Sequence, residues 1–215
     1  MLTALFMPIP FAYDERDARI RELNDLELRE MNESYYLWQA ELESYGITPL
    51  SGRFNNQAAA QYALRWWNVR NPAYRNFDNS GGNCTNFVSQ AMSAGGWTHV
   101  HGFYRNAPHW WYDYGWLGIQ TWSWVGVNHW HDFANIHSRR STILNNPRNL
   151  IVGEVLQVSF DGGINKNHSM IVTSTSTSDI FLTYNSDDTL NASLASLQIR
   201  FPNARWVPHL IFSTF

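Results

Sequence analysis

A single cysteine stands at the start of a predicted helix, one residue after a pair of glycines. Residues 81–90 read Gly-Gly-Asn-Cys-Thr-Asn-Phe-Val-Ser-Gln, and Cys84 is the only cysteine of the chain. Apolar side chains recur at helical spacing from Cys84 to Met92. A thiol in the first turn of a helix lies near unpaired N–H groups and the positive end of the dipole, which favour the thiolate. The pattern predicts a nucleophile with a lowered pKa.

The same cysteine also fits a structural role. Free cysteine is among the most buried residue types, and Cys84 continues the apolar stripe of its helix. The two glycines favour the catalytic interpretation, because a substrate must reach the sulfur of a nucleophile and a core position needs no such approach.

A cysteine nucleophile needs a base, and histidine is the commonest one. His168 stands at the head of an apolar strand pattern, His-Ser-Met-Ile-Val-Thr. Considered alone, it could equally be an ordinary strand histidine with a hydrogen-bond partner. Beside a cysteine nucleophile it is the candidate general base.

The remaining histidines are numerous enough to suggest a metal site, but their spacing does not support one. Six of the eight histidines lie in residues 97–149, where two pairs are spaced two residues apart and aspartates stand nearby. Imidazole and carboxylate groups can bind zinc, but this spacing matches no established zinc pattern. We therefore expect neither a metal nor another cofactor. The groups concerned are His99 with His101, His129 with His131, and Asp113 or Asp132.

A wider set of residues resembles a known family. Asn71-Pro72-Ala73-Tyr74, Phe77, residues 81–90 and Gly95-Gly96 resemble the putative amidase domain family. That family is grouped with papain-like cysteine hydrolases and is similar in plan to NlpC/P60 and CHAP domains. The resemblance spans roughly residues 55–190. It departs at Asn83, where such domains usually carry Asp.

The resemblance implies a catalytic pair and an activity. Cys84 would attack an amide or peptide carbonyl and form a thioester, and His168 on the family's histidine strand would move the proton. The substrate would be a peptide or amide, with cell-wall peptide from peptidoglycan among the candidates. An acyltransferase using the same pair, or a binding module that has lost activity, remain the alternatives.

A third residue should orient His168. If the following hairpin pairs Thr175 with Ser178, His168 falls opposite Asn185, whose amide oxygen could fix the tautomer of the ring. A register slip of one residue would present Tyr184 instead.

Asp187 and Asp188 follow Asn185 closely and are the alternatives to it. For the oxyanion we expect the backbone N–H of Cys84, with Asn79 or Asn83 as a side-chain donor.

The elements that must position these residues indicate an α+β fold. A long helix is predicted over 14–45 and a second one over 57–70, where Asn55 or Asn56 caps the start and Pro72 blocks continuation. Four strands follow the cysteine helix, so that helices come first and an antiparallel sheet after. The predicted strands are 154–160, 168–173, 180–185 and 205–212, the last with Pro208 marking an edge or bulge.

We therefore expect a papain-like (NlpC/P60-like) domain over 51–215, with the nucleophile helix packed on the sheet, and an N-terminal arm and long helix over 1–50. Residues 97–149 form a tryptophan-rich insert without clear periodicity. It is predicted to wall the substrate groove, although a self-packed aromatic subdomain is an alternative. The groove candidates are Trp97, Trp110, Trp122, Trp124 and Trp130.

Composition limits the partners. The net charge is −3 with one lysine, Lys166, and no basic patch, which argues against nucleic acid. One cysteine excludes an internal disulfide and a cysteine-based zinc cluster. No segment reaches membrane-spanning length, and residues 1–12 lack the charged region of a signal peptide. We expect a cytoplasmic protein or a mature secreted form.

Overall fold

The computed structural model describes residues 53–105, 108–113 and 119–215. The predicted N-terminal arm and the helix over 14–45 lie outside these residues. No helix in the described part of the chain is long and apolar enough to cross a membrane.

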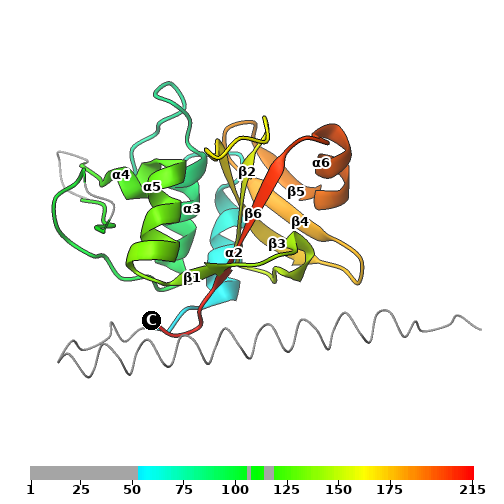
Figure 1. The fold of residues 1–215 in the computed structure, drawn as a ribbon. Helices are drawn as coiled ribbons and strands as arrows, with labels where there is room; N and C mark the ends of the chain where they lie inside the picture. Colours follow the sequence, from blue (N-terminus) through cyan, green and yellow to red (C-terminus); the bar gives the residue numbers. More distant parts are fainter. Residues whose placement is uncertain (1–52, 106–107, 114–118) are drawn as a thin grey trace, which may run out of the picture. The chain divides into compact units, whose positions relative to one another are not determined.

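A six-stranded antiparallel sheet carries the second half of the chain (Figure 1). Its strand order is β1-β6-β2-β3-β4-β5, so the last strand of the chain lies between β1 and β2. Together with the helices that precede it, this sheet confirms the predicted α+β class. The strands are β1 (Ser141–Ile143), β2 (Val155–Ser159), β3 (His168–Thr175), β4 (Ile180–Tyr184), β5 (Thr189–Ser193) and β6 (Arg205–Ile211).

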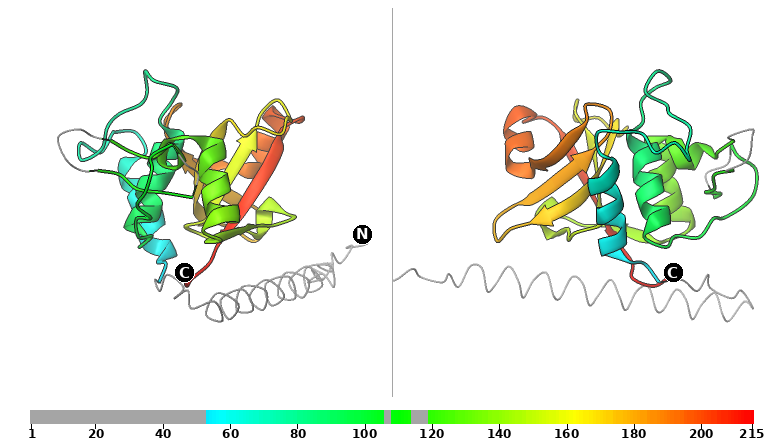
Figure 2. Two further views of the ribbon diagram at one scale, coloured as in Figure 1. Left: turned by 60° about the vertical axis from the view of Figure 1, so that its left-hand side comes forward. Right: turned by 180° about the vertical axis from the view of Figure 1, so that it is seen from behind.

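Most of the helices precede the long strands of the sheet in the sequence. Helix α3 contacts α2 and α4 as well as strand β3, so it lies between the other helices and the sheet of the described domain (Figures 1 and 2). The helices are α2 (Asn56–Trp66), α3 (Cys84–Ala94), α4 (Trp122–Val125), α5 (Val127–His131), the π-helical turn η1 (Asp132–His137), the 3-10 turn η2 (Pro147–Asn149) and α6 (Leu194–Arg200).

Helix α3 is buried on all sides rather than on one stripe. Its polar residues as well as its apolar ones, from Cys84 to Met92, are all buried. The polar ones have partners there: Ser89 donates to the carbonyl of Trp124 at 2.8 Å, and Gln90 accepts from the hydroxyl of Tyr62 at 2.6 Å. A buried polar group costs little once it is paired. The nucleophile candidate therefore stands on a rigid central element.

Helix α2 starts where the sequence predicts. The side chain of Asn55 accepts a 3.0 Å hydrogen bond from the N–H of Ala58, which is an N-cap. The helix ends at Trp66 rather than at Arg70. Residues 67–70, predicted as the last turn of the helix, instead belong to a loop, and Arg70 at its end lines the pocket described below.

The four predicted strands are present, with Pro208 inside β6. This strand is flanked by β1 and β2, so the prediction of an edge position is wrong. Pro208 lies beyond the end of β1, where its carbonyl accepts from Leu144. Its missing N–H points to the same side as its carbonyl, so no bond within β1 is lost. The sequence interpretation missed β1, β5 and α6.

The aromatic segment is core, not a groove wall. Trp97 is 3 % exposed, and Trp110, Trp124 and Trp130 are 0 % exposed. Trp97 stacks on Trp130 at 5.6 Å, and Trp110 lies 4.5 Å from Trp124. Side chains so buried do not face a groove, so these four were wrongly predicted as groove residues. They share one core with α2 and α3, so the alternative of a self-packed aromatic subdomain is also wrong. Trp122, at 43 % exposed, is the accessible member of the set.

Candidate active site

The thiol of Cys84 lies where α3 meets the end of β3. The sulfur lies 3.8 Å from the hydroxyl of Thr85, and the backbone N–H of Ser169 favours its thiolate form. Ser169 directly follows His168, so the sulfur lies beside the peptide that joins the two candidate residues. Only 7 % of Cys84 is exposed.

Burial raises the pKa of the Cys84 thiol, which corrects the predicted lowering. Loss of solvent around the sulfur is the largest effect, and the N–H of Ser169 and the side chain and N–H of Thr85 oppose it without overcoming it. The start of the helix is present as predicted, but water is excluded from it. The resting thiol is therefore protonated.

His168 begins β3, and its ring packs among aromatic side chains. It meets Tyr184 edge-on at 4.8 Å and Phe160 at 5.9 Å, and it is 8 % exposed. Burial lowers the pKa of His168 to about 4, and the carboxylate of Asp187 opposes this shift. Its Nε2 is buried and has no hydrogen-bond partner among the described residues.

Neighbouring strand residues show which way His168 points. Ser169 and Ile171 face α3, since Ser169 bonds to Thr85 and Ile171 belongs to the core shared with the helices. Side chains alternate along a strand, so His168 leaves the sheet on the side of Phe160 and Tyr184. Within the described ranges no hydrogen bond joins its ring to the thiol. A direct contact between the two remains a prediction.

The predicted register of the β3–β4 hairpin is wrong. Thr175 pairs with Ile180 rather than with Ser178, and a bulge lies between Val172 and Ser174. The shift brings Tyr184 onto the ring of His168, which is the outcome expected for a slipped register.

Asn185 therefore makes other contacts. It is buried, its side-chain NH2 donates to the carbonyls of Trp66 and Trp67 at 3.2 and 2.7 Å, and its oxygen accepts from Asn83 at 2.8 Å. Its predicted role in orienting His168 has no support in these contacts. The residue instead joins α2 to the start of α3.

Asn83 belongs to the same cluster. Its side-chain oxygen accepts from the N–H of Phe77 at 3.2 Å and from Asn86 at 2.8 Å, while its NH2 donates to Asn185. These bonds fix the start of α3 around a side chain that is 2 % exposed, and the predicted oxyanion role has no support in them. Asn79 is exposed in the preceding turn, and its role remains a prediction.

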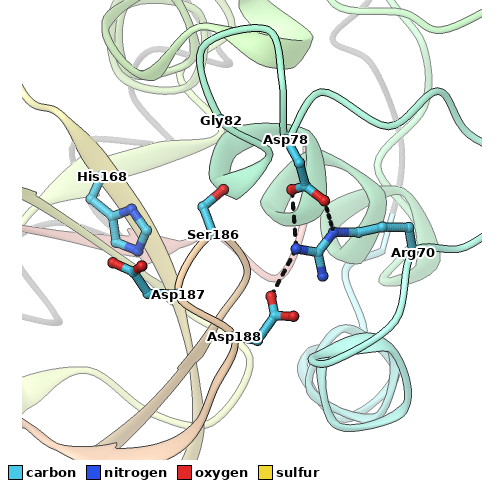
Figure 3. Close-up of a pocket in the computed structure, with 7 residues that line it drawn as sticks. All are labelled: Arg70, Asp78, Gly82, His168, Ser186, Asp187 and Asp188. Carbon is cyan, nitrogen blue, oxygen red and sulfur yellow. Dashed lines mark hydrogen bonds and ion pairs between the residues drawn. The ribbon is translucent and has the colours of Figure 1, made fainter.

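A pocket of about 610 Å³ opens beside these residues (Figure 3). Gly82 and His168 both line it, one two residues before Cys84 and the other just before Ser169. The remaining lining residues are charged or polar: Arg70, Asp78, Ser186, Asp187 and Asp188.

The guanidinium of Arg70 is held by two carboxylates of this pocket. It lies 2.9 and 3.0 Å from the oxygens of Asp78 and 2.8 Å from an oxygen of Asp188. Ser186 joins the opposite side of the pocket to the cysteine helix, because its hydroxyl accepts the N–H of Asn83 at 2.7 Å. The pocket is thus built from the loop before α3 and the turn after β4.

Comparison with known proteins identifies the family of this chain. Residues 53–206 match the family described as "Putative amidase domain". The chain belongs to this family. It is also 34 % identical over 125 residues to the uncharacterized protein YhbB of Bacillus subtilis, an alignment that covers 56 % of this chain and 37 % of the relative. The chain thus spans little more than a third of that relative's length. No solved structure matches.

In this putative amidase domain, a buried polar chain behind the thiol escaped the sequence interpretation. The hydroxyl of Thr85 lies 3.1 Å from that of Ser169, which accepts from the amide of Gln157 at 3.1 Å. The same amide lies 3.1 Å from His209, a fully buried histidine. The available signal was a polar residue inside each apolar strand pattern, Gln157 in β2 and Ser169 in β3, since both face the helices.

The other histidines do not gather into a metal site. Among the residues that the structure describes, no group of three or more His, Cys, Asp or Glu side chains could hold an ion. His99 and His101 pack as aromatic rings, 5.7 Å apart, and His131 lies 3.4 Å from His209.

Proposed function

We propose that this protein is a cysteine-dependent hydrolase of amide or peptide bonds, with the papain-like arrangement in which Cys84 is the nucleophile and His168 the general base. Membership of the family implies an amide substrate and hydrolase-like activity. The observation that carries the assignment to these two residues is the position of the sulfur, at the start of α3 and against the backbone N–H that follows His168.

The reaction would run in two halves. The sulfur of Cys84 attacks the carbonyl carbon while its proton moves to the neutral ring of His168, and the backbone N–H of Cys84 stabilises the oxyanion. The C–N bond breaks, the amine leaves with the proton from His168, and a thioester remains. His168 then takes a proton from water, the hydroxide attacks the thioester, and the carboxylic acid and the thiol are released.

The resting protonation states fit general-base catalysis. The pKa of the thiol is raised and that of His168 is lowered to about 4, so both groups are neutral near pH 7. A neutral imidazole can accept the thiol proton during the attack, whereas a preformed thiolate–imidazolium pair is not favoured here. For this transfer the ring must turn toward the sulfur.

We assign the orienting role to Asp187. Its carboxylate favours the charged form of His168, and Figure 3 shows it beside the nitrogen-bearing edge of the ring. Because His168 becomes positive in each transition state, an adjacent negative charge would lower the barrier. Asp187 was one of the two alternatives to Asn185 at the level of sequence.

The decisive experiment is digestion of peptides, simple amides and muropeptides, followed by mass spectrometry. Wild-type protein is expected to release a new amine and a new acid, and Cys84→Ala and His168→Ala to release neither. Cys84→Ser is the matched control, since it keeps the size and polarity of the side chain while replacing the sulfur. Equal turnover by wild type and Cys84→Ala would contradict the proposal. Transfer of the acyl group to an added amine would identify an acyltransferase.

A binding module is the second candidate, favoured by the buried and protonated thiol and by the separate faces of His168 and Ser169. A module would bind a peptide or muropeptide without converting it. The same wild-type digestion distinguishes the two, because a module leaves every substrate intact while its binding remains measurable by calorimetry.

A further inference from the structure

The pocket beside His168 carries more negative than positive charge. Three of its lining residues are aspartates and one is an arginine, whose guanidinium two of the aspartates already hold. The ring of His168 is neutral near pH 7, so it adds no positive charge. In the part of the pocket that the structure describes, the carboxylate of Asp187 has no ion-pair partner.

A buried, unpaired atom in the same wall points to a ligand. The Nε2 of His168 is inaccessible to solvent and makes no hydrogen bond to any described residue, although the residue is only 8 % exposed. A buried ring nitrogen without a partner costs free energy, so such atoms call for an explanation. A polar group of a bound molecule would supply the missing partner.

Asp187 and Asp188 lie in a turn with a strained backbone. Ser186 and Asp187 both have positive φ values, 60° and 85°, which non-glycine residues rarely adopt. Backbone strain of this kind persists only where the surroundings fix it, and it gathers at functional sites. Here the bond from Asn83 to Ser186 fixes the turn against the cysteine helix.

From this juxtaposition of three carboxylates, one neutralised guanidinium and the unpaired His168 nitrogen, we propose that the substrate carries an ammonium group close to the scissile amide. This inference rests on the proposed hydrolase function and names its substrate class. The ammonium group would lie against Asp187 and Asp188, with the scissile carbonyl toward Gly82 and the thiol.

An anionic substrate fits the pocket less well. Arg70 is the only cation among the lining residues that the structure describes, and it is already bonded to Asp78 and Asp188. A substrate carboxylate would have to displace one of these carboxylates and would then face the other two. The balance of charge therefore favours a cation over an anion.

The test uses two peptide amides that both carry a diamino-acid residue next to the scissile bond. The side-chain amine of this residue is free in one peptide and N-acetylated in the other. For wild type we expect kcat/KM to favour the free amine by about fivefold or more, the size of one partly exposed ion pair. Asp188→Asn should reduce this preference toward unity, and added salt should weaken it. Asp113→Asn, in the aromatic segment, is the matched control and should leave the preference unchanged.

The outcomes separate this inference from the proposed function. Equal turnover of both peptides, lost in Cys84→Ala, would overturn the ammonium preference and leave the hydrolase intact. If no peptide is hydrolysed, binding of the same pair to Cys84→Ala protein, measured by calorimetry, still decides the preference. Tighter binding of the free amine by about fivefold supports it, and equal or weaker binding overturns it.

Discussion

At the scale of single residues, the cysteine and the histidine rest in neutral forms because both are desolvated. The sequence correctly predicts that Cys84 lies at the start of a helix. The glycines before it and the helical periodicity after it are local signals. The sequence does not predict the pKa of the thiol, because that depends on the tryptophan-rich segment and β3, which close over the helix start. Burial is a property of the tertiary structure, and here it outweighs the helix dipole.

The acid limb of the pH profile should lie unusually low. Catalysis requires the unprotonated ring of His168, whose pKa is lowered to about 4. As pH falls, kcat/KM should therefore hold to about pH 5 and decline through about pH 4, rather than through 6.5 as for an ordinary histidine. Initial rates from pH 3.5 to 8 measure this.

Asp187→Asn should move that limb lower still, because the Asp187 carboxylate raises the pKa of His168 against the effect of burial. It should also lower kcat by about tenfold or more, as expected when charge that stabilises a transition state is lost. A limb near pH 6.5 in wild type would show that His168 is exposed during turnover.

Cys84 should react slowly with iodoacetamide. Its raised pKa and 7 % exposure leave little accessible thiolate at pH 7. We expect labelling at least about tenfold slower than that of a cysteine in a short peptide, rising steeply with pH. Mass spectrometry of the intact protein follows the reaction, and unfolding in urea should restore the peptide rate. Fast labelling of the native protein would contradict the buried position of the thiol.

At the scale of elements, an asparagine cluster holds the cysteine helix. Asn83, Asn86 and Asn185 bond to each other and to the chain around them, including the carbonyls of Trp66 and Trp67 and the indole of Trp124. Sequence reasoning found Asn83 and Asn185 but assigned them to catalysis. It could not find their pairing, because a bulge at Val172–Ser174 shifts the register and leaves no mark in the sequence.

Asn185→Ala should be destabilising. It removes two donors and an acceptor from a site that is 1 % exposed and leaves the amide of Asn83 and two carbonyls short of partners. Unsatisfied buried groups predict a loss of about 2–4 kcal/mol in the free energy of unfolding. Urea unfolding measures it, and Asn203→Ala in an exposed turn should change stability by less than about 0.5 kcal/mol. Equal effects of the two substitutions would show that the cluster contributes nothing.

At the scale of the whole molecule, the α+β class with four of the six strands was predictable, and the position of the aromatic residues in the core was not. Strand alternation in residues 154–212 and the helix cap at Asn55 are local signals, so they can be recognised without knowledge of the tertiary structure. The tryptophans between 97 and 130 lack periodicity, and only the fold decides whether they face solvent or core. In this structure four of them form the core around α3.

Two opposing kinds of buried group should set the pH range of stability. The pKa values of His131 and His168 are lowered to about 4, so below 6.5 the unfolded chain binds more protons at these sites, and stability should fall as pH drops from 6.5 to 4. Burial raises the pKa of Glu154 to about 8. There the folded chain binds more protons, so stability should fall as pH rises from 4.5 toward 8.

The histidines dominate below pH 6.5 and Glu154 above it, so the melting temperature should peak near pH 6.5. Between pH 6.5 and 8 the free energy of unfolding should decrease by up to about 1.4 kcal/mol per pH unit, the maximum for one group. Glu154 accepts from the N–H groups of Ile151 and Ile211, so Glu154→Gln, with a single acceptor oxygen, should be less stable than wild type at pH 6.5. The decisive measurement is the pH dependence. In wild type the melting temperature should decrease from pH 6.5 to 8, and in Glu154→Gln this decrease should be absent. A decline that persists in Glu154→Gln would place the responsible group elsewhere.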